Sequence, residues 1–591
     1  MRVKKRGLPS WSARSKIMNK RTLHPQPEPA RRCFLLGLGA AAATVSAFPA
    51  SQSPSILPRP TFPNLLRQPD RASAFGEAKS KELLLTRSAN NWQASGIELS
   101  IELNNSKHSI ESSLFVTAPK VSLTNLRLRW HGSFPEGFRF LGDHWERSYG
   151  DLEFRGFVGD RLMPWYFLAS DGHFSQATGV KTGAASICYW QVDAAGVTLW
   201  LDVGNGGSGV RLGDRRLLAA TVVQQEARDG ESAFDLARSF CQSLCDRPML
   251  PREPVFGSNN WYYMYGENTS ARRSLEDASL LAELVPSSVA NRPFCVIDMG
   301  WHAARDGAGP VSQTSKSYPD MPALAAKMSG MHVRPGIWSR PTLTADPKAL
   351  PWRLPPAGGR AQGDLIALDP TIPEARNYIA ENIAILRQWG YELIKFDYST
   401  FDLLGRWGFQ MGESLTDAGW HFHDRSRTNA EIITDLYRAI REAAGRVTLI
   451  GCNTIGHLAA GLVEVQRIGD DTSGREWSRT RKMGVNTLAF RLPQHNTFFA
   501  ADADCVPVTN EIPWDLTQQW LDLVSRSGTA LFVSVDPAIV QPNQKLALQS
   551  ALAAAARSQQ FAIPLDWQDT TTPERWTLDG KSSLYNWYKG D

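Results

Sequence analysis

Polar and apolar residues alternate along the first large part of the chain, from about residue 81 to residue 231. The clearest runs are residues 96–103, 126–130 and 197–203, and turn-forming Asn and Gly residues separate such runs. A period of two places every second side chain on the same face of a strand, so that one face is buried and the other is solvated. Residues 81–231 are therefore predicted to form an antiparallel β-sandwich.

A different pattern begins after Pro254, where short apolar runs alternate with segments of helical periodicity. The clearest helix is predicted over residues 372–389, and a helical segment at 232–253 is expected to bridge this region to the sandwich. Eight strand-then-helix units in about 300 residues indicate a (β/α)8 TIM barrel over residues 254–560, which leaves residues 561–591 as a short C-terminal tail. The eight strands are expected at residues 255–263, 294–299, 333–338, 393–398, 447–452, 464–468, 497–501 and 529–535.

A doubly wound open sheet is the alternative arrangement of such units. That fold usually carries a Gly-rich GxGxxG turn after its first strand, where it cradles the phosphates of a dinucleotide. No such turn follows the first predicted strand here, so the barrel is favoured and no dinucleotide is expected. The cysteines show no CxxC pair and no Cys/His spacing typical of zinc ligands, so we expect no metal and no cofactor. Cys241 and Cys245, on one predicted helix, are expected to pack as free thiols rather than to form a disulfide.

The N-terminal segment has the features of an export signal. Arg31 and Arg32 precede a short apolar run, residues 34–48, which is too short to span a bilayer and ends in small residues. The paired arginines resemble a twin-arginine signal, and an uncleaved basic anchor is the alternative. Residues 1–50 are thus predicted to be a signal peptide read by the twin-arginine export machinery, followed by a Ser/Pro-rich linker at 51–80. A periplasmic or secreted protein is the expectation that follows.

The charge distribution argues against nucleic acid as a partner. The chain has 64 Lys and Arg against 59 Asp and Glu, but the first 50 residues hold ten of the bases and a single acid, which leaves 54 bases against 58 acids. Binding to nucleic acid needs clustered Lys and Arg that displace counterions from phosphate. The body of the protein has no such excess, and the 20 tryptophans of the whole chain suit sugar faces as well as a core.

Carboxylates gather where the predicted barrel strands end. Asp298, Asp397, the pair Asp470 and Asp471, and then Asp502 and Asp504 follow or end the second, fourth, sixth and seventh strands. The carboxyl ends of barrel strands share one face, which carries the active site in TIM-barrel enzymes. Two carboxylates about 5 to 5.5 Å apart can cleave a glycosidic bond with retention of configuration, one as nucleophile and one as general acid/base.

Several of these motifs are similar to those of a known group of enzymes. Residues 394–397 (Ile-Lys-Phe-Asp) resemble the nucleophile strand of the clan D glycoside hydrolases, the α-galactosidase families 27 and 36. Residues 467–472 (Arg-Ile-Gly-Asp-Asp-Thr) resemble the acid/base segment, where an arginine precedes the acid by four positions. The likeness continues, in the same order along the chain, at residues 260–261, 296–301, 335–338 and 501–505. The preceding β-sandwich suits family 36 better than family 27.

The resemblance implies a role for each matching residue. Asp397 would be the nucleophile and Asp471 the general acid/base, with Asp470 as the rival for the second role. Because Asp471 must be protonated for part of the cycle, we expect apolar surroundings or a nearby negative charge to raise its pKa. The sugar-binding residues would be Lys395 and Arg467 for hydroxyls, Asp298 at the far edge of the sugar, and Trp261 and Trp338 as walls, while Asn453 is the candidate for contact with the 2-position.

The implied activity is that of an exo-acting, retaining α-glycosidase on an oligosaccharide or glycoside. One departure bears on the sugar: family members carry two successive acids on the second strand, whereas this chain has Asp298 and then Met299. Losing one charged acceptor makes galactose doubtful and favours a pentopyranose or a differently substituted hexose. The alternatives are a transglycosidase of the same clan, a non-catalytic carbohydrate-binding barrel, and a metal-dependent hydrolase using His421 and His423, which otherwise belong to a loop that shapes specificity.

Overall fold

The computed structural model describes residues 60–77, 82–105, 110–361 and 363–589. The predicted signal peptide (residues 1–50) and the first part of the predicted linker lie outside the described residues, so the export route stays a prediction. Among the described residues, no helix combines the length and the apolar character needed to cross a membrane.

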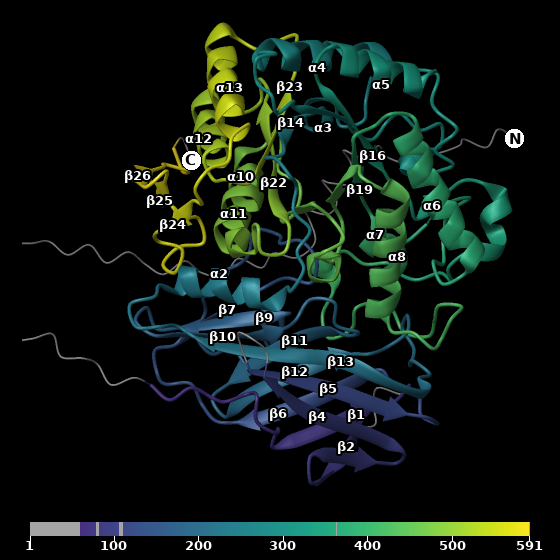
Figure 1. Ribbon diagram of the computed structural model, residues 1–591, viewed down its shortest axis with the longest axis vertical. Helices are drawn as coiled ribbons and strands as arrows, with labels where there is room; N and C mark the ends of the chain where they lie inside the picture. Colours follow the sequence, from purple (N-terminus) through teal and green to yellow (C-terminus); the bar gives the residue numbers. More distant parts are fainter. Residues whose placement is uncertain (1–59, 78–81, 106–109, 362, 590–591) are drawn as a thin grey trace, which may run out of the picture. The chain divides into compact units, whose positions relative to one another are not determined.

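The N-terminal half of the described chain is all β. Its strands are β1 (Arg71–Phe75), β2 (Glu82–Ser88), β3 (Asn91–Ala94), β4 (Ile97–Asn105), β5 (Ile110–Ala118), β6 (Asn125–His131), β7 (Arg139–Gly142), β8 (Met163–Pro164), β9 (Tyr166–Ser170), β10 (Ser175–Val180), β11 (Ile187–Asp193), β12 (Gly196–Asp202) and β13 (Gly213–Glu226). In the described residues they form one 13-stranded sheet in the order β7-β9-β10-β13-β5-β4-β3-β2-β1-β6-β12-β11-β8, with antiparallel neighbours (Figure 1). The sheet folds over into a sandwich, as the alternating pattern predicts.

Strand β6 shows why the pattern works. Leu126, Leu128 and Trp130 point into the core and are at most 2% exposed, whereas Arg127 and Arg129 between them are half-buried. The strand pairs with β12 and with β1, the latter from Arg71↔Arg129 to Phe75↔Asn125.

The sheet starts earlier than the predicted boundary at residue 81. Strand β1 lies inside the segment predicted as linker (51–80), and Ala72 and Ala74 are fully buried in it. Small residues have weak strand propensity, and a five-residue strand gives little periodicity, so this strand carried almost no sequence signal. Its place in the sheet comes from its two neighbours rather than from its own composition.

A single helix, α2 (Ala233–Leu244), occupies the predicted bridge at 232–253. Ser232 caps it by accepting a hydrogen bond of 3.1 Å from the backbone N–H of Asp235. Cys241 and Cys245 are buried free thiols, as predicted.

The C-terminal half contains a closed parallel barrel. Its strands, in spatial order, are β14 (Phe256–Asn259), β15 (Phe294–Ile297), β16 (Arg334–Ser339), β19 (Leu393–Phe396), β20 (Thr448–Gly451), β21 (Val465–Arg467), β22 (Ala500–Val508) and β23 (Ala530–Val535). Parallel pairing of β14 with β23 closes the ring. The predicted fold class, a β-sandwich followed by a (β/α)8 barrel, is therefore confirmed. Strand β22 begins near the predicted position but continues to Val508.

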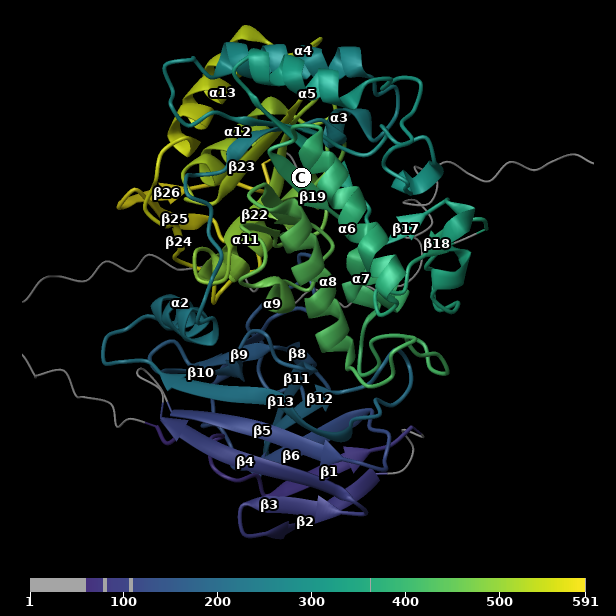
Figure 2. The same cartoon turned by 45° about the vertical axis from the view of Figure 1, so that its right-hand side comes forward.

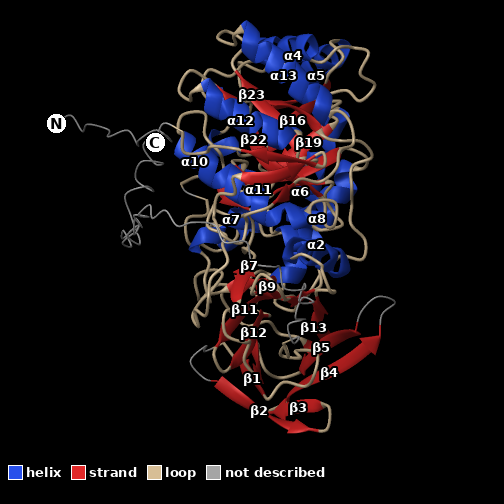
Figure 3. Cartoon of the chain, turned by 90° about the vertical axis from the view of Figure 1, so that its left-hand side faces the viewer, coloured by secondary structure: helices blue, strands red, loops and turns tan. Residues whose placement is uncertain are grey.

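Helices surround the barrel strands (Figures 2 and 3). The longer ones are α4 (Ala271–Leu284), α5 (Met321–Gly330), α6 (Pro373–Gln388), α8 (Asn429–Ala444), α12 (Trp514–Ser525) and α13 (Pro542–Ala555). The short ones are α3 (Trp261–Met264), α7 (Ser399–Leu404), α9 (Gly456–Ala459), α10 (Trp477–Thr480) and α11 (Thr487–Arg491), the 3-10 turns η1 (Arg305–Gly307), η2 (Pro347–Trp352), η3 (Gly408–Gln410) and η5 (Leu492–Gln494), and the π-helix η4 (Arg481–Asn486). Strands β17 (Leu343–Thr344) and β18 (Ile366–Ala367) form a small antiparallel pair in the loop after β16.

The predicted C-terminal tail (561–591) is a small antiparallel sheet of β24 (Ile563–Pro564), β25 (Arg575–Leu578) and β26 (Lys581–Leu584). Trp576 and Trp587 are fully buried, and the carbonyl of Trp587 accepts a 2.8 Å hydrogen bond from the indole N–H of Trp477 on α10. The tail is thus packed onto the barrel.

Candidate active site

The carboxyl ends of the barrel strands bring most of the predicted site residues to one rim. Asp298 directly follows β15, Asp397 directly follows β19, and Asp470 and Asp471 follow β21. Lys395 and Arg467 lie within β19 and β21, and Trp338 lies within β16. Because parallel strands present these ends on the same side of a barrel, side chains far apart in sequence become neighbours.

Lys395 forms a buried ion pair with Asp298. The ammonium lies 2.8 Å from the Asp298 carboxylate, which also accepts a 2.7 Å hydrogen bond from the Asn259 amide. Burial lowers the pKa of Lys395, but Asp298 and, at longer range, Asp397 outweigh it and raise this pKa well above the usual value. Lys395 is therefore a fixed positive charge in the barrel mouth.

Two donors orient the Asp397 carboxylate. One oxygen accepts a 3.1 Å hydrogen bond from the indole N–H of Trp338, and the other accepts a 2.7 Å bond from the backbone N–H of Tyr398. Tyr398 has a left-handed backbone with φ of 62°, which is costly for a residue with a Cβ and is typical of functional sites. This turn leaves Asp397 partly exposed at the rim, in a fixed orientation.

Four cations lie around Asp471, namely Arg467, Arg147, Lys395 and Arg479. The Asp471 carboxylate lies 3.0 Å from the guanidinium of Arg467 and 4.0 Å from that of Arg147, and it is 30% exposed. Burial raises the pKa of Asp471, but Arg467, Arg147 and Lys395 lower it to about 2. The expectation of a raised pKa is wrong for this unliganded site, because the positive charges outweigh the removal of water.

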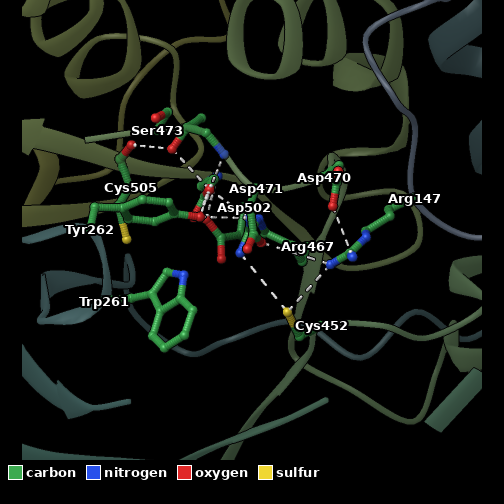
Figure 4. Close-up of polar contacts among 12 residues, drawn as sticks. Arg147, Trp261, Tyr262, Cys452, Arg467, Asp470, Asp471, Ser473, Asp502 and Cys505 are labelled. Atoms are coloured by element: carbon green, nitrogen blue, oxygen red, sulfur yellow. Dashed lines mark hydrogen bonds and ion pairs between the residues drawn. The ribbon is translucent and has the colours of Figure 1, made fainter. Parts of the chain in front are cut away.

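Asp470 is engaged differently from its neighbour. One oxygen is bound by Arg147 at 2.9 Å (Figure 4) and the other by Arg479 at 2.8 Å, so both are occupied. Among the described residues, the second oxygen of Asp471 has no ion-pair or hydrogen-bond partner, and the side chain is 30% exposed. The geometry therefore favours Asp471 over Asp470 for proton transfer to a substrate.

The two candidate catalytic carboxylates share electrostatic neighbours. Lys395 interacts with both Asp397 and Asp471, and both acids act to raise the pKa of the Tyr398 phenol. The two acids thus face a common region of the rim.

Asp504 on β22 anchors the turn that carries Asp471. Its carboxylate lies 2.5 Å from Arg467 and accepts hydrogen bonds from the backbone N–H of Thr472 at 2.7 Å and from the Tyr262 hydroxyl. Asp502 is buried beside it, and burial is the main reason why the pKa of Asp502 rises to about 6, although Arg467 opposes this. Sequence reasoning placed these acids at the rim but gave them no role.

The two predicted tryptophan walls are nearly buried. Trp338 is 2% exposed and reaches the site through its indole N–H, while Trp261 is 7% exposed and packs edge-on against Tyr265, with ring centroids 5.7 Å apart. Met299 packs with Trp261 at this edge of the rim and is partly exposed. The surface next to Asp298 is therefore apolar.

Asn453 does not have the predicted role. It is fully buried, its amide N–H donates to Glu146, and its carbonyl oxygen accepts a 3.0 Å bond from the backbone N–H of Phe401. With both ends of the amide engaged, Asn453 joins loops instead of contacting a sugar. The neighbouring Cys452 thiol, in contrast, lies 3.9 Å from both Arg147 and Arg467 (Figure 4).

The sandwich contributes residues that sequence reasoning missed. The loop of residues 143–151, after β7, places Glu146, Arg147 and Ser148 beside the end of β21. Ser148 exchanges two backbone hydrogen bonds with residues 468 and 470, at 2.9 and 2.8 Å, and so continues the barrel edge by one residue. In the sequence this loop shows only a Glu-Arg pair beside a tryptophan within the predicted β-sandwich, which does not indicate a partner about 320 residues away.

The loop after β19 carries aromatic residues rather than metal ligands. Phe401 stacks on Trp407 with centroids 4.6 Å apart, and the Arg147 guanidinium lies over the Trp407 ring at 5.5 Å. His421 Nδ1 lies 2.7 Å from the carbonyl of Phe422, which is an intra-loop contact. Within the described residues, no group of three or more His, Cys, Asp or Glu side chains is arranged to hold a metal ion.

Comparison with known proteins locates the fold. No protein-family model and no curated protein matches the chain. Among solved structures, it is similar to TtGalA, the α-galactosidase from Thermus thermophilus, at 15% identity and a TM-score of 0.56, over 83% of this chain and 97% of that one. It is also similar to the GH36 α-galactosidase AgaA from Geobacillus stearothermophilus (14% identity, TM-score 0.53, over 78% and 67% of the two chains) and to the α-galactosidase from Lactobacillus brevis (12%, 0.52, over 83% and 73%). The chain therefore has the fold of the GH36 α-galactosidases, as the motifs predicted.

Proposed function

We propose that the protein is a retaining, exo-acting α-glycosidase that works by double displacement. The observation that supports this most strongly is the pairing of Asp397 and Asp471 on one rim with unlike surroundings. Asp397 is oriented by two neutral donors and can attack, whereas the Asp471 side chain, at 30% exposure, is accessible to a leaving group. Two carboxylates in different environments are what the two roles require.

The reaction has two steps. In the first, Asp397 forms a bond to the anomeric carbon as the bond to the leaving oxygen breaks, and Asp471 gives that oxygen its proton. In the second, the Asp471 carboxylate takes a proton from water, the water oxygen bonds to the anomeric carbon, and Asp397 is released. Two inversions give net retention, and Asp471 ends the cycle protonated again.

The sugar that binds between the two acids would be one that needs no charged hydrogen-bond acceptor at the position of Met299. TtGalA has been solved with stachyose and a doubly substituted variant of AgaA with raffinose, so α-linked oligosaccharides are the first natural sugars to test as substrates. Asp298 and Lys395 can bind hydroxyls at one edge, but the thioether of Met299 cannot replace a second carboxylate there. We therefore expect a pentopyranose or a differently substituted hexose to be preferred to galactose. We also propose that the protein is exported by the twin-arginine route and works in the periplasm or outside the cell.

The test is a screen of aryl α-glycosides of galactose, N-acetylgalactosamine, glucose and arabinopyranose with the wild type, Asp397→Ala and Asp471→Ala. Asp397→Ala should lose activity on every substrate, and azide should restore turnover with a product of inverted configuration. Asp471→Ala should keep activity only on substrates whose leaving group needs no proton, because the nucleophile remains. Asp569→Asn, which removes a 70% exposed carboxylate of the C-terminal segment, is the control and should keep the wild-type dependence on the leaving group. Wild-type rates in both alanine variants on all active substrates would refute the assignment.

A further inference from the structure

Arg147 is a buried cation that the sandwich delivers to the rim of the barrel. The loop that carries it is fixed on both sides: Ser148 pairs through its backbone with residues 468 and 470, and its hydroxyl lies 2.6 Å from that of Thr487. Glu146 accepts a 2.9 Å hydrogen bond from the backbone N–H of Gly408. The position of Arg147 is therefore set by contacts with the barrel and not by a free loop.

The guanidinium itself is held at four points. One nitrogen binds Asp470 at 2.9 Å, the other lies 4.0 Å from Asp471 and 3.9 Å from the thiol of Cys452, and the planar group lies over Trp407. The side chain is 7% exposed, and its Nε has no hydrogen-bond partner in the part of the chain that the structure describes. A guanidinium does not lose its proton in proteins, so this is a permanent charge beside Asp471.

We propose that Arg147 is a positioning residue for Asp471: it pins the turn of residues 469–471 through Asp470 and favours the ionised form of Asp471, so that the sandwich sets the pH range in which the barrel works. This inference rests on the proposed function, because it takes Asp471 to be the acid/base. It adds a residue from outside the barrel and a division of labour between the two acids of the turn. Arg147 forms its 2.9 Å ion pair with Asp470, and it acts on Asp471, 4.0 Å away, through its charge.

Other charges also face Asp471, and the effect of Arg147 has to be separable from theirs. They are Arg467 on β21, Lys395 on β19, Arg479 on α10, Tyr262 on α3 and Tyr265 just after it, Tyr398 at the start of α7, and Asp470 and Asp504 beside the turn. Arg467 and Lys395 are each paired to a second carboxylate, Asp504 and Asp298, within the barrel. Arg147 is the cation in this group that comes from the sandwich, so its charge can be changed while the barrel's own pairs stay intact.

The two chemical steps should respond to that charge in opposite directions. The first step needs Asp471 protonated, so a nearby cation confines it to lower pH; the second needs the carboxylate, so the same cation favours it. Removing the charge should shift the basic limb of the pH profile of kcat/KM, measured with a poor leaving group, to higher pH by about one unit or more. With an activated aryl glycoside, for which the second step limits turnover, the acidic limb of kcat should move upward as well, so that kcat falls at low pH.

The experiment compares the wild type with Arg147→Gln and Arg147→Lys over the full pH range on both kinds of substrate. Arg147→Lys keeps the charge and should stay close to the wild-type limbs, whereas Arg147→Gln should show both shifts. The matched control is Arg155→Gln, at the end of the same stretch of sandwich, whose guanidinium is 52% exposed and pairs with Glu153. It should leave both profiles unchanged.

If Arg147→Gln does not fold, Arg147→Met removes the same charge, keeps the apolar packing over Trp407 and leaves Asp470 paired with Arg479, so it carries the same test. Unchanged limbs in a folded, active Arg147→Gln or Arg147→Met would overturn the inference, as would a rise in KM with both limbs in place, since that would make Arg147 a substrate ligand. A wild type without activity on any glycoside would instead overturn the proposed function, which keeps the two failures distinct.

Discussion

Arg491 and Asp143 form a buried ion pair between α11 of the barrel and the start of the sandwich loop of residues 143–151. Two nitrogens of Arg491 bind the two oxygens of Asp143 at 2.8 and 3.1 Å, and the third donates to the carbonyl of Ile468 at 2.8 Å. Both side chains are at most 3% exposed. Arg491→Met would keep most of the packing but leave the Asp143 carboxylate in the core with one remaining side-chain donor, Gln494 at 2.9 Å.

Breaking one side of a fully buried pair costs about 3–5 kcal/mol, because the remaining charge stays without compensation. We therefore expect Arg491→Met to lower the free energy of unfolding by about that amount, measured by urea unfolding followed through tryptophan fluorescence. Adding Asp143→Leu should recover most of the loss, since an apolar pair of similar volume no longer buries a charge. The exposed Arg155→Met serves as control and should cost less than about 1 kcal/mol. If Arg491→Met were no more destabilising than Arg155→Met, the idea that this pair ties the sandwich loop to the barrel would have to be given up.

Two further predictions concern the site and the pH dependence of stability. Trp338→Phe removes the indole N–H that donates to Asp397 while keeping an aromatic ring. A hydrogen bond to a charged group is worth about 1.5–3 kcal/mol, so kcat/KM should fall about ten- to a hundred-fold. An unchanged kcat/KM would contradict the orienting role of Trp338. Burial lowers the pKa of His457 to about 4, although its Nε2 contact with the Val180 carbonyl, at 2.7 Å, opposes this. Below the unfolded-state pKa of about 6.5 the unfolded chain then binds more protons, so stability should fall as the pH drops from about 6.5 to about 4. His457→Gln, which can still donate to Val180, should make that fall shallower by up to about 1.4 kcal/mol per pH unit, and identical slopes by urea unfolding would count against it.

The barrel could be predicted because its information is local. Each strand is a short apolar run, and a strand such as β19 ends directly before its acid, Asp397, so both the strand and the rim residue are visible in a few letters of sequence. Strand β1 escaped because small residues hide its period. The same locality led to Asp397, Lys395 and Arg467, which are separated from the strand ends by at most two positions.

What the sequence could not show depends on contacts across hundreds of residues. Arg147 meets Asp470 because the backbone of Ser148 pairs with that of residues 468 and 470, and backbone pairing of single residues leaves no pattern. Burial alone would raise the pKa of Asp471, as the sequence predicts, but four cations from different parts of the fold, Arg467, Arg147, Lys395 and Arg479, reverse the sign. Asn453 was placed at the rim from its position after β20, but its partner Glu146 comes from the sandwich.

The packing of the last residues has a practical consequence for anyone who handles this protein. Trp587 holds the indole of Trp477, the first residue of the short helix α10, and that helix presents Arg479 to Asp470. Removing Trp587, or fusing a bulky reporter next to it, would loosen the start of α10 at Trp477. Because Arg479 lies only two residues further along α10, its ion pair with Asp470 would also be disturbed. Purification handles are better avoided at that end.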